Sequence, residues 1–576
     1  MNKRSVLFFI IFFISFAIHA QPFTGNLTLF QGISRGAVVF ADFDNDNDLD
    51  LFISGQDASY NEFAGIYRND NGTFIYAGGG ITGMYNCSAA AADYDLDGWM
   101  DLVMTGQDYD GNITRLYRNN GNGTFSEVQA GLYNAGANGD LAWADVNSDG
   151  YPDLVISGNW LTRLYLNNGD GTFTHTPSGL QGMNSPSLDW GDFDNDGDPD
   201  LLMVGDAGSV GETYIYINHQ GTFERLDAQI EGAVGGMARW GDSDNDGYLD
   251  LLITGKDATL VPVSYVYRNN GDMTFSFANA GLIGTALGPA NWIDFDNDGD
   301  LDVMLAGENA GCGNSSTRLY SNNGAGSFSE IQAGLGFVER AASAWGDFDN
   351  DGDQDLVLSG IAASPLTWLY RNDLRSAPFQ PNTPPSVPGN IYTYVSGNYA
   401  VISWSKSTDN QSPQEAITYN VMMGTQPGNS NVVSPLADPF SGRRYVTAPG
   451  NAGQNDFMIF RHLEPGTYYF SVQAIDQAFA GSEFSEEESF MVLPTGTVSL
   501  PVNSMKTFFS GDRLHIERTE GGTAIADVFF LTGQLAASAI IEGNSASVSL
   551  SALRPGIYII RITGKSAIST GKAAKY

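Results

Sequence analysis

Cysteine, histidine and positive charge are scarce in this chain. Its 576 residues include 2 Cys, 5 His and 27 Lys plus Arg, against 66 Asp plus Glu, so that the net charge is -39. Two cysteines cannot form a disulfide framework, and this acidic balance repels nucleic-acid backbones and anionic membrane surfaces. We therefore expect no nucleic-acid partner, and stability that comes from apolar burial or from metal.

Long apolar runs are also missing, except at the N-terminus. Residues 1–20 begin with Lys3 and Arg4, continue as an apolar stretch and end in Ala20. This pattern is typical of a cleaved secretory signal peptide, and the apolar stretch is shorter than the roughly 20 residues that a membrane span needs. A membrane anchor is the alternative. We expect an exported protein, secreted or at the cell surface, with no transmembrane segment in the mature chain.

Glycine and apolar residues are abundant. The chain has 69 Gly, and its hydrophobic fraction is 42%. Apolar content of this size is too high for a disordered acidic tail, and glycine beside Asn and Asp is typical of short strands joined by tight turns. The composition therefore predicts a folded, all-β protein.

One acidic pattern, Asp-x-Asp-x-Asp-Gly-x-x-Asp, recurs seven times about 50 residues apart. Each copy is followed by Tyr-x-Asn, and six copies also by Thr or Ser and then Phe. In the second copy we expect strands at 87–92, 102–105, 114–118 and 124–129. Repeats of this length with four strands are typical of β-propeller blades, so the sequence predicts a seven-bladed β-propeller.

The ends of the repeat array predict how the ring closes. The first strand of each unit is rich in small residues, which suits strands that converge on an axis. The seventh unit lacks a fourth strand because the prolines from Pro378 onward cannot supply ladder hydrogen bonds. Residues 25–33 resemble the missing strand. We expect them to complete the seventh blade from the N-terminal end.

The acidic loops have the composition of cages for a hard cation. Carboxylates at positions one, three, five and nine, with a backbone carbonyl at position seven, suit Ca²⁺, up to seven ions per chain. Copies one and three depart from the pattern, with Asn47 in place of Gly and Asn147 at the third position. An Asx turn without metal is the alternative. The predicted metal-binding residues are Asp42, Asp44, Asp46, Asp48 and Asp50; Asp93, Asp95, Asp97, Trp99 and Asp101; Asp145, Asn147, Asp149, Tyr151 and Asp153; Asp192, Asp194, Asp196, Asp198 and Asp200; Asp242, Asp244, Asp246, Tyr248 and Asp250; Asp294, Asp296, Asp298, Asp300 and Asp302; and Asp347, Asp349, Asp351, Asp353 and Asp355.

The acidic pattern followed by Leu-Tyr-x-Asn-Asn-Gly resembles the FG-GAP or VCBS repeats of integrin α-chain heads and of many bacterial secreted proteins. The resemblance covers about residues 21–375, within a propeller domain expected at 21–377. It implies a calcium-binding propeller whose metal loops join the first two strands of each blade on one face, with partners on the opposite face.

Two further β modules follow. Residues 383–493 contain strand-like alternation, and the segment from Leu463 to Tyr469 resembles the tyrosine corner of fibronectin type III domains, with Trp404 as the core indole. We expect this module to act as a spacer. Residues 499–576 contain Leu-x-Pro-Gly-Ile-Tyr-x-x-Arg from Leu553, which resembles the C-terminal sorting domain of the type IX secretion system of Bacteroidota. That resemblance implies a β-sandwich read by the secretion machinery at the outer membrane; another plain β-sandwich is the alternative.

The sequence predicts no catalytic residues, because its many paired carboxylates would be occupied by Ca²⁺. Its histidines are not spaced as metal ligands, and the single Gly-x-Ser-x-Gly match, at Ser34, lies between predicted strands. Cys87 and Cys312 fall in different units, and we predict that they are not bonded to each other.

We therefore expect an adhesion or ligand-binding protein with an extracellular protein or glycan partner. The alternative is a carbohydrate-active protein, either polysaccharide lyase-like or lectin-like. Aromatic side chains on one rim could stack on sugar rings. The candidates are Tyr60, Tyr85, Tyr109, Tyr133 and Trp160.

Overall fold

The structure is a computed structural model of the chain. It describes residues 23–27, 30–208, 211–309, 315–374, 381–493, 506–510, 513–517, 524–529, 535–541, 545–549, 556–563 and 568–575. The expected signal peptide at 1–20 and Cys312 lie outside the described residues.

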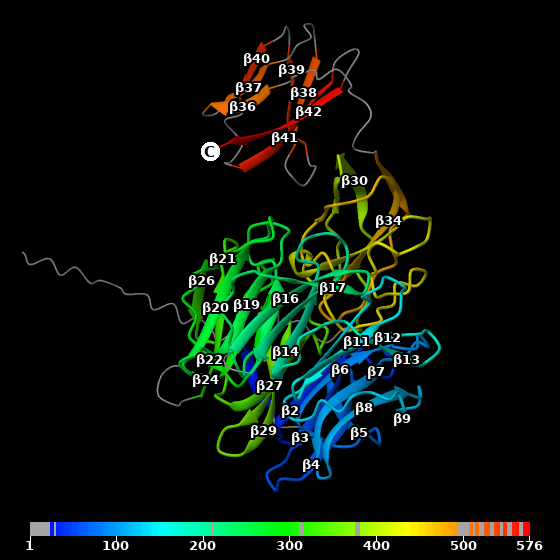
Figure 1. Cartoon of the computed structure of the whole chain (residues 1–576), viewed down its shortest axis with the longest axis vertical. Coiled ribbons are helices and arrows are strands. Elements are labelled where there is room, and N and C mark those ends of the chain that lie inside the picture. The colour runs from blue at the N-terminus through cyan, green and yellow to red at the C-terminus, as the bar shows by residue number, and fades with distance from the viewer. Residues whose placement is uncertain are drawn as a thin grey trace, which may run out of the picture.

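Four-stranded antiparallel sheets follow one another along the first part of the chain, as the repeats predict (Figure 1). We call them units one to seven. Units one to four contain β2 (Ser34–Ala41), β3 (Asp50–Gln56), β4 (Glu62–Asp70) and β5 (Thr73–Gly78); β6 (Tyr85–Ala92), β7 (Asp101–Asp108), β8 (Gly111–Asn119) and β9 (Phe125–Val128); β10 (Asp140–Ala144), β11 (Asp153–Gly158), β12 (Leu161–Asn167) and β13 (Phe173–Thr176); and β14 (Asn184–Gly191), β15 (Asp200–Asp206), β16 (Gly211–His219) and β17 (Thr222–Leu226).

Units five and six are joined by a short additional strand, β22 (Thr285–Ala286), which pairs with both. Units five to seven contain β18 (Ala238–Gly241), β19 (Asp250–Lys256), β20 (Pro262–Asn269) and β21 (Phe275–Ala278); β23 (Ala290–Ile293), β24 (Asp302–Asn309), β25 (Ser315–Asn322) and β26 (Phe328–Ile331); and β27 (Glu339–Gly346), β28 (Asp355–Ile361) and β29 (Pro365–Asn372) together with β1 (Phe23–Leu27). The fold is therefore an all-β propeller of repeated four-stranded sheets.

The N-terminal strand completes the last unit. β1 pairs antiparallel with β29, so that Phe23 lies opposite Asn372, and the first strand of unit one contacts β27 of unit seven. Phe23 is buried and its ring lies 6.0 Å from that of Trp345. This confirms that the N-terminal segment completes the seventh unit, although the strand spans 23–27 and not the whole of the predicted 25–33. β1 covers the outer edge of β29, which would otherwise be unpaired.

Apolar clusters lie between neighbouring units. Ala41 and Phe52 of unit one, for example, share a cluster with Met100 and Leu102 of unit two. Because each unit buries most of its apolar face against its neighbours, the units depend on one another for stability.

The next module is a pair of three-stranded sheets around one apolar core that includes Trp404, Tyr419 and Phe470. The hydroxyl of Tyr468 donates a hydrogen bond to the carbonyl of Glu464 at 2.8 Å, as the tyrosine of a tyrosine corner does. The strands are β30 (Gly389–Ser396), β31 (Tyr399–Ser405) and β33 (Phe457–Phe460) in one sheet, and β32 (Thr418–Gly424), β34 (Gly466–Ile475) and β35 (Glu488–Val492) in the other, with a 3-10 helix η1 (Gln414–Ala416). We call this pair of sheets the docked sandwich.

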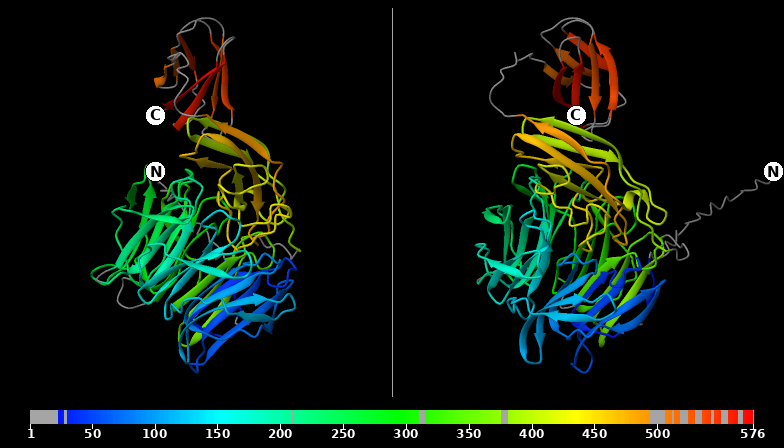
Figure 2. Two further views of the ribbon diagram at one scale, coloured as in Figure 1. Left: turned by 45° about the vertical axis from the view of Figure 1, so that its right-hand side comes forward. Right: turned by 90° about the vertical axis from the view of Figure 1, so that its right-hand side faces the viewer.

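The docked sandwich lies against the propeller in all three views (Figures 1 and 2). The backbone N–H of Asp93, for example, donates to the carbonyl of Tyr445 at 2.9 Å. The sequence predicts a spacer, which would hold its neighbouring modules apart. The docked sandwich instead packs along one face of the propeller.

Two sheets form the last part of the chain, drawn in orange and red in Figure 1. Residues 550–555, which carry most of the Leu-x-Pro-Gly motif, lie outside the described residues. The strands are β36 (Lys506–Ser510), β37 (Arg513–Glu517) and β40 (Ser545–Ser549) in one sheet, and β38 (Ala524–Phe529), β39 (Leu535–Ile541), β41 (Gly556–Thr563) and β42 (Ile568–Lys575) in the other. Among the described parts of the chain, no helix is long and apolar enough to cross a membrane.

Candidate metal centre

Each acidic loop joins the first strand of a unit to its second strand. We call them loops one to seven, at 42–50, 93–101, 145–153, 192–200, 242–250, 294–302 and 347–355. The sixth position has a left-handed backbone, with φ of 105° at Gly98 and 68° at Asn47. Glycine and asparagine adopt this conformation most readily, so Asn47 keeps the turn of loop one. The fourth position is also left-handed, as at Asn45 and Leu96, and the acidic pattern alone does not predict this second turn.

The first Asp of each loop holds the turn together. In loop two, the carboxylate of Asp93 accepts the backbone N–H of Asp97 at 3.0 Å and that of Gly98 at 3.1 Å. The corresponding pair of hydrogen bonds is present in every loop. The repeated sequence therefore folds into one repeated cage.

The ninth Asp ties the loop to the third strand. Asp101 accepts the backbone N–H of Asn119 at 2.7 Å and that of Tyr94 at 3.2 Å, and each loop has this pair. Asp101 is fully buried. Its position is thus fixed by the fold before any ligand binds.

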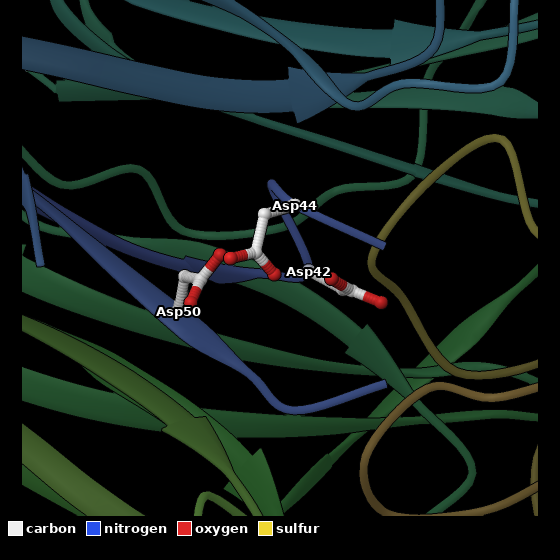
Figure 3. A group of neighbouring side chains, drawn as sticks. All are labelled: Asp42, Asp44 and Asp50. Carbon is white, nitrogen blue, oxygen red and sulfur yellow. The ribbon is translucent and has the colours of Figure 1, made fainter. Parts of the chain in front are cut away.

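The third position supplies an oxygen that lacks a hydrogen bond. In loop one, ligand oxygens of Asp42, Asp44 and Asp50 lie within 4.8 Å of one another, and Figure 3 shows the carboxylates of Asp44 and Asp50 facing each other. A buried oxygen without a hydrogen bond is costly unless a cation compensates for it. The position-three Oδ1 atoms that are buried and without a hydrogen bond belong to Asp44, Asp95, Asp244, Asp296 and Asp349. This donor set fits a hard cation.

Loops three and four satisfy the third position in other ways. Asn147 donates from Nδ2 to Asp149 at 3.0 Å, and the Oδ1 atom of Asp194 accepts the N–H of Asp196 at 3.1 Å. Loop three thus has one carboxylate fewer, as the sequence indicates.

Burial makes the charged form of these carboxylates costly. It raises the pKa of Asp50, Asp101 and Asp302 to about 9, and that of Asp153 to about 8. Carboxylates kept this close together in an apolar setting need protons or a cation for stability.

Basic side chains from the third strand already neutralise some loops. Arg118 lies 2.7 Å from Asp95 and 2.5 Å from Asp97, and Arg371 lies 2.8 Å from Asp349. The third strand of unit six has Ser321 at the corresponding position. Loop six therefore combines five Asp with no arginine from its own third strand.

The repeated Tyr-x-Asn has a structural role that sequence reasoning did not assign. Asn119 donates from Nδ2 to the carbonyl of Phe43, in the preceding unit, at 2.8 Å, and each unit has such a bond. In unit one the acceptor is the carbonyl of Phe348 in unit seven. These asparagines link the loops of neighbouring units around the whole ring. Their recurrence in step with the acidic loops was the available signal.

The aromatic candidates divide into two groups. Tyr60, Tyr109 and Trp160 lie in turns between second and third strands and are 77%, 93% and 49% exposed. Tyr85 begins β6 and is half-buried. Tyr133 is also half-buried, beneath the guanidinium of Arg163 at 4.9 Å from its ring.

The remaining residues singled out by sequence lie apart from one another. Ser34 is a buried first residue of β2, paired with Gln56. Cys87 is a free thiol in β6. His219, which the sequence left without a role, lies 3.5 Å from Asp196 in loop four.

Comparison with solved structures gives distant matches. The chain is similar to an Agrocybe aegerita lectin that recognises non-reducing terminal N-acetylglucosamine, with 20% identity and a TM-score of 0.36 over 52% of this chain and 79% of the lectin. It is similar to the rhamnogalacturonan lyase YesW, with 16% identity and a TM-score of 0.36 over 62% of this chain and 76% of the lyase. A third match, the Photorhabdus luminescens Tc holotoxin pore, has 12% identity and a TM-score of 0.31, over 91% of this chain and 22% of the pore chain.

Comparison with curated proteins gives no match. The family model of the FG-GAP-like repeat matches six overlapping segments, at 42–104, 93–156, 145–203, 192–253, 242–305 and 294–358. Together they span more than half of the chain and contain all seven acidic loops. The first strand of unit one, which precedes loop one, lies outside the match. The chain belongs to the FG-GAP-like repeat family.

Proposed function

We propose that the chain is an extracellular, calcium-dependent, seven-bladed propeller that binds a protein or glycan ligand. The observation that carries the calcium site is the buried Oδ1 without a hydrogen bond at the third position of five loops. Ca²⁺ prefers oxygen ligands and would supply the missing positive charge. Positions one, three, five and nine would hold it by their carboxylates, and position seven by its carbonyl.

Export is part of the same proposal. The apolar segment within residues 1–20 supports a signal peptide, and the terminal Leu-x-Pro-Gly-Ile-Tyr-x-x-Arg motif supports a type IX sorting module at 499–576. The propeller would occupy 21–377 and a fibronectin type III-like module 383–493. The hydrogen bond from Tyr468 and the buried Trp404 favour that assignment of the docked sandwich.

Titration calorimetry and melting of the mature chain test the calcium site. We expect several ions per chain, with dissociation constants as weak as about 10⁻⁴ to 10⁻³ M, as for extracellular modules. A chelator should lower the melting temperature. Fewer than four bound ions at saturating Ca²⁺, or a melting temperature that the chelator does not change, would refute the proposal.

Glycan binding is the second candidate, favoured by exposed aromatics on the face away from the acidic loops. Tyr60 and Trp160 have φ of 65° and 64°, a strained region for non-glycine residues, and Leu260 occupies the matching turn of unit five with φ of 63°. Strain of this kind persists only where the surroundings impose it, and it is frequent at binding sites. Exposed rings held in fixed turns suit stacking on sugars.

A glycan array would separate the two ligand classes. If a glycan binds, changing Tyr60, Tyr109 and Trp160 to Ala together should abolish the signal, whereas Phe440→Ala, at a 91% exposed ring on the docked sandwich, should not. Turnover of the bound glycan would indicate an enzyme. If both variants lose the glycan signal equally, or both keep it, these three rings are not part of the binding site.

A further inference from the structure

The docked sandwich covers the face of the propeller that carries the acidic loops, and it does so through the metal-ligand residues themselves. Asn455 donates from Nδ2 to Oδ2 of Asp242 at 2.9 Å, in loop five. Gln454, its neighbour, donates from Nε2 to Oδ2 of Asp294 at 2.6 Å, in loop six. Two adjacent amides therefore hold the first carboxylates of two adjacent loops.

Other loops contact the sandwich through different groups. Arg443 lies 2.6 Å from Oδ2 of Asp93 in loop two. The backbone N–H of Arg461 donates to the carbonyl of Asn195 in loop four at 2.7 Å, and that of Asp347 in loop seven donates to the carbonyl of Gln477 at 3.2 Å. The contact thus extends around the ring.

The sandwich also forms part of the wall of a cavity at the centre of this face. The cavity has a volume of ≈ 770 Å³ and is lined by inner-strand residues such as Trp190 and Arg239 and by sandwich residues such as Asn451. Since this end of the ring is covered, the turns that carry Tyr60 and Tyr109 form the face left open to large partners.

The chemistry of the contacts differs between loops. The amides of Gln454 and Asn455 are neutral and donate to the Oδ2 atom of a carboxylate that also accepts a backbone N–H of its own loop, so they orient this carboxylate without replacing a cation. Arg443 brings a positive charge to loop two, where Arg118 already pairs with Asp95 and Asp97. The amides are compatible with a cation in loops five and six, whereas Arg443 competes with one in loop two.

We propose that docking of the sandwich on the propeller is coupled to calcium in loops five and six, through the amides of Gln454 and Asn455. The inference rests on the calcium site proposed above. A cation that fixes Asp242 and Asp294 presents their Oδ2 atoms to the amides in one orientation, and docking fixes the same carboxylates for the cation. By linkage, each event strengthens the other by the same factor.

The test compares the full chain with a Gln454→Ala/Asn455→Ala variant and with a matched control, Gln426→Ala/Asn410→Ala, which removes two exposed amides of the same module. Calorimetry measures Ca²⁺ binding. Hydrogen–deuterium exchange at the backbone N–H groups of Asp93, Arg461 and Asp347 measures docking, because these groups donate across the contact.

At saturating Ca²⁺ we expect faster exchange at these three amides in the Gln454/Asn455 variant, and at least about fivefold weaker binding of two ions, the lower end of ordinary coupling. The control should match the parent chain in both measurements. Unchanged propeller tryptophan fluorescence would show that the variant is folded.

The outcomes separate the two proposals. If the parent chain binds Ca²⁺ with the same affinity as the Gln454/Asn455 variant, the coupling is wrong while the calcium site stands. If exchange at the three amides is equally slow in both, the amides do not couple docking to the ions. If no Ca²⁺ binds to any of the proteins, both proposals fall.

Discussion

The asparagines that link neighbouring units should contribute strongly to propeller stability, and Asn167 offers the cleanest case. Its side chain is 3% exposed, and Nδ2 donates to the carbonyl of Tyr94 in unit two at 2.7 Å and to that of Pro152 at 3.1 Å. Its Oδ1 accepts the N–H of Gly169 at 3.0 Å. Loop three, beside it, has the fewest carboxylates, so a change here perturbs calcium binding least.

Asn167→Ala removes three hydrogen bonds and leaves two buried carbonyls without this donor. At about 1 kcal/mol for each bond, with a further cost for unsatisfied buried groups, the loss in free energy of unfolding should be about 3 to 5 kcal/mol. Asn168→Ala is the matched control, because Asn168 is exposed and bonds only to Thr172 and Thr174 of its own hairpin. Its cost should be within about 1 kcal/mol.

Urea unfolding followed by tryptophan fluorescence measures both variants at saturating Ca²⁺. Five tryptophans lie in or beside first strands of units three to seven, so the signal reports on the propeller. A midpoint for Asn167→Ala as high as that of Asn168→Ala would refute the reasoning, because it would mean that units hold together by apolar packing alone.

The remaining predictions concern pH, calcium and the two ends of the chain. Burial raises the pKa of Asp50, Asp101 and Asp302 from 3.8 to about 9, so in chelator these groups favour folding below about pH 4, and that stability is lost as pH rises through 9. In chelator, the melting temperature should fall from pH 5 to pH 7 and again to pH 9, and Ca²⁺ should restore most of the stability at pH 9. A melting temperature that rises with pH would contradict the burial argument. Asp296→Ala should remove one ion from the calorimetric stoichiometry, since loop six has no arginine from its third strand; an unchanged stoichiometry would exclude this loop. Deleting residues 23–33 should expose the edge of β29 and cause aggregation in light scattering, and a monomeric, equally stable product would show that β1 is dispensable. Deleting residues 499–576 should leave calcium-dependent melting unchanged but retain the chain in the periplasm of its native host, whereas normal arrival at the surface would exclude the sorting role.

The repeated architecture could be predicted from sequence because its signals are local. The alternation of apolar residues, the Asn-Gly turns and the acidic pattern each lie within one unit, and they recur in fixed order. Even the closure by β1 was predictable, since a missing strand at one end and a surplus strand at the other fit only together. The left-handed turn at Asn47 is of the same local kind, because asparagine tolerates this backbone conformation more readily than most residues.

The contacts between units and modules were decided by tertiary structure. Nothing in the local pattern says that Asn119 binds the carbonyl of Phe43, because the two residues meet only when neighbouring units pack. Likewise, Gln454 and Asn455 are ordinary polar residues of a sandwich loop, and their acceptors Asp242 and Asp294 lie far away in the chain. A sequence specifies periodicity and turns through neighbouring residues, whereas the pairing of distant polar groups depends on which surfaces come together when the chain buries its apolar area.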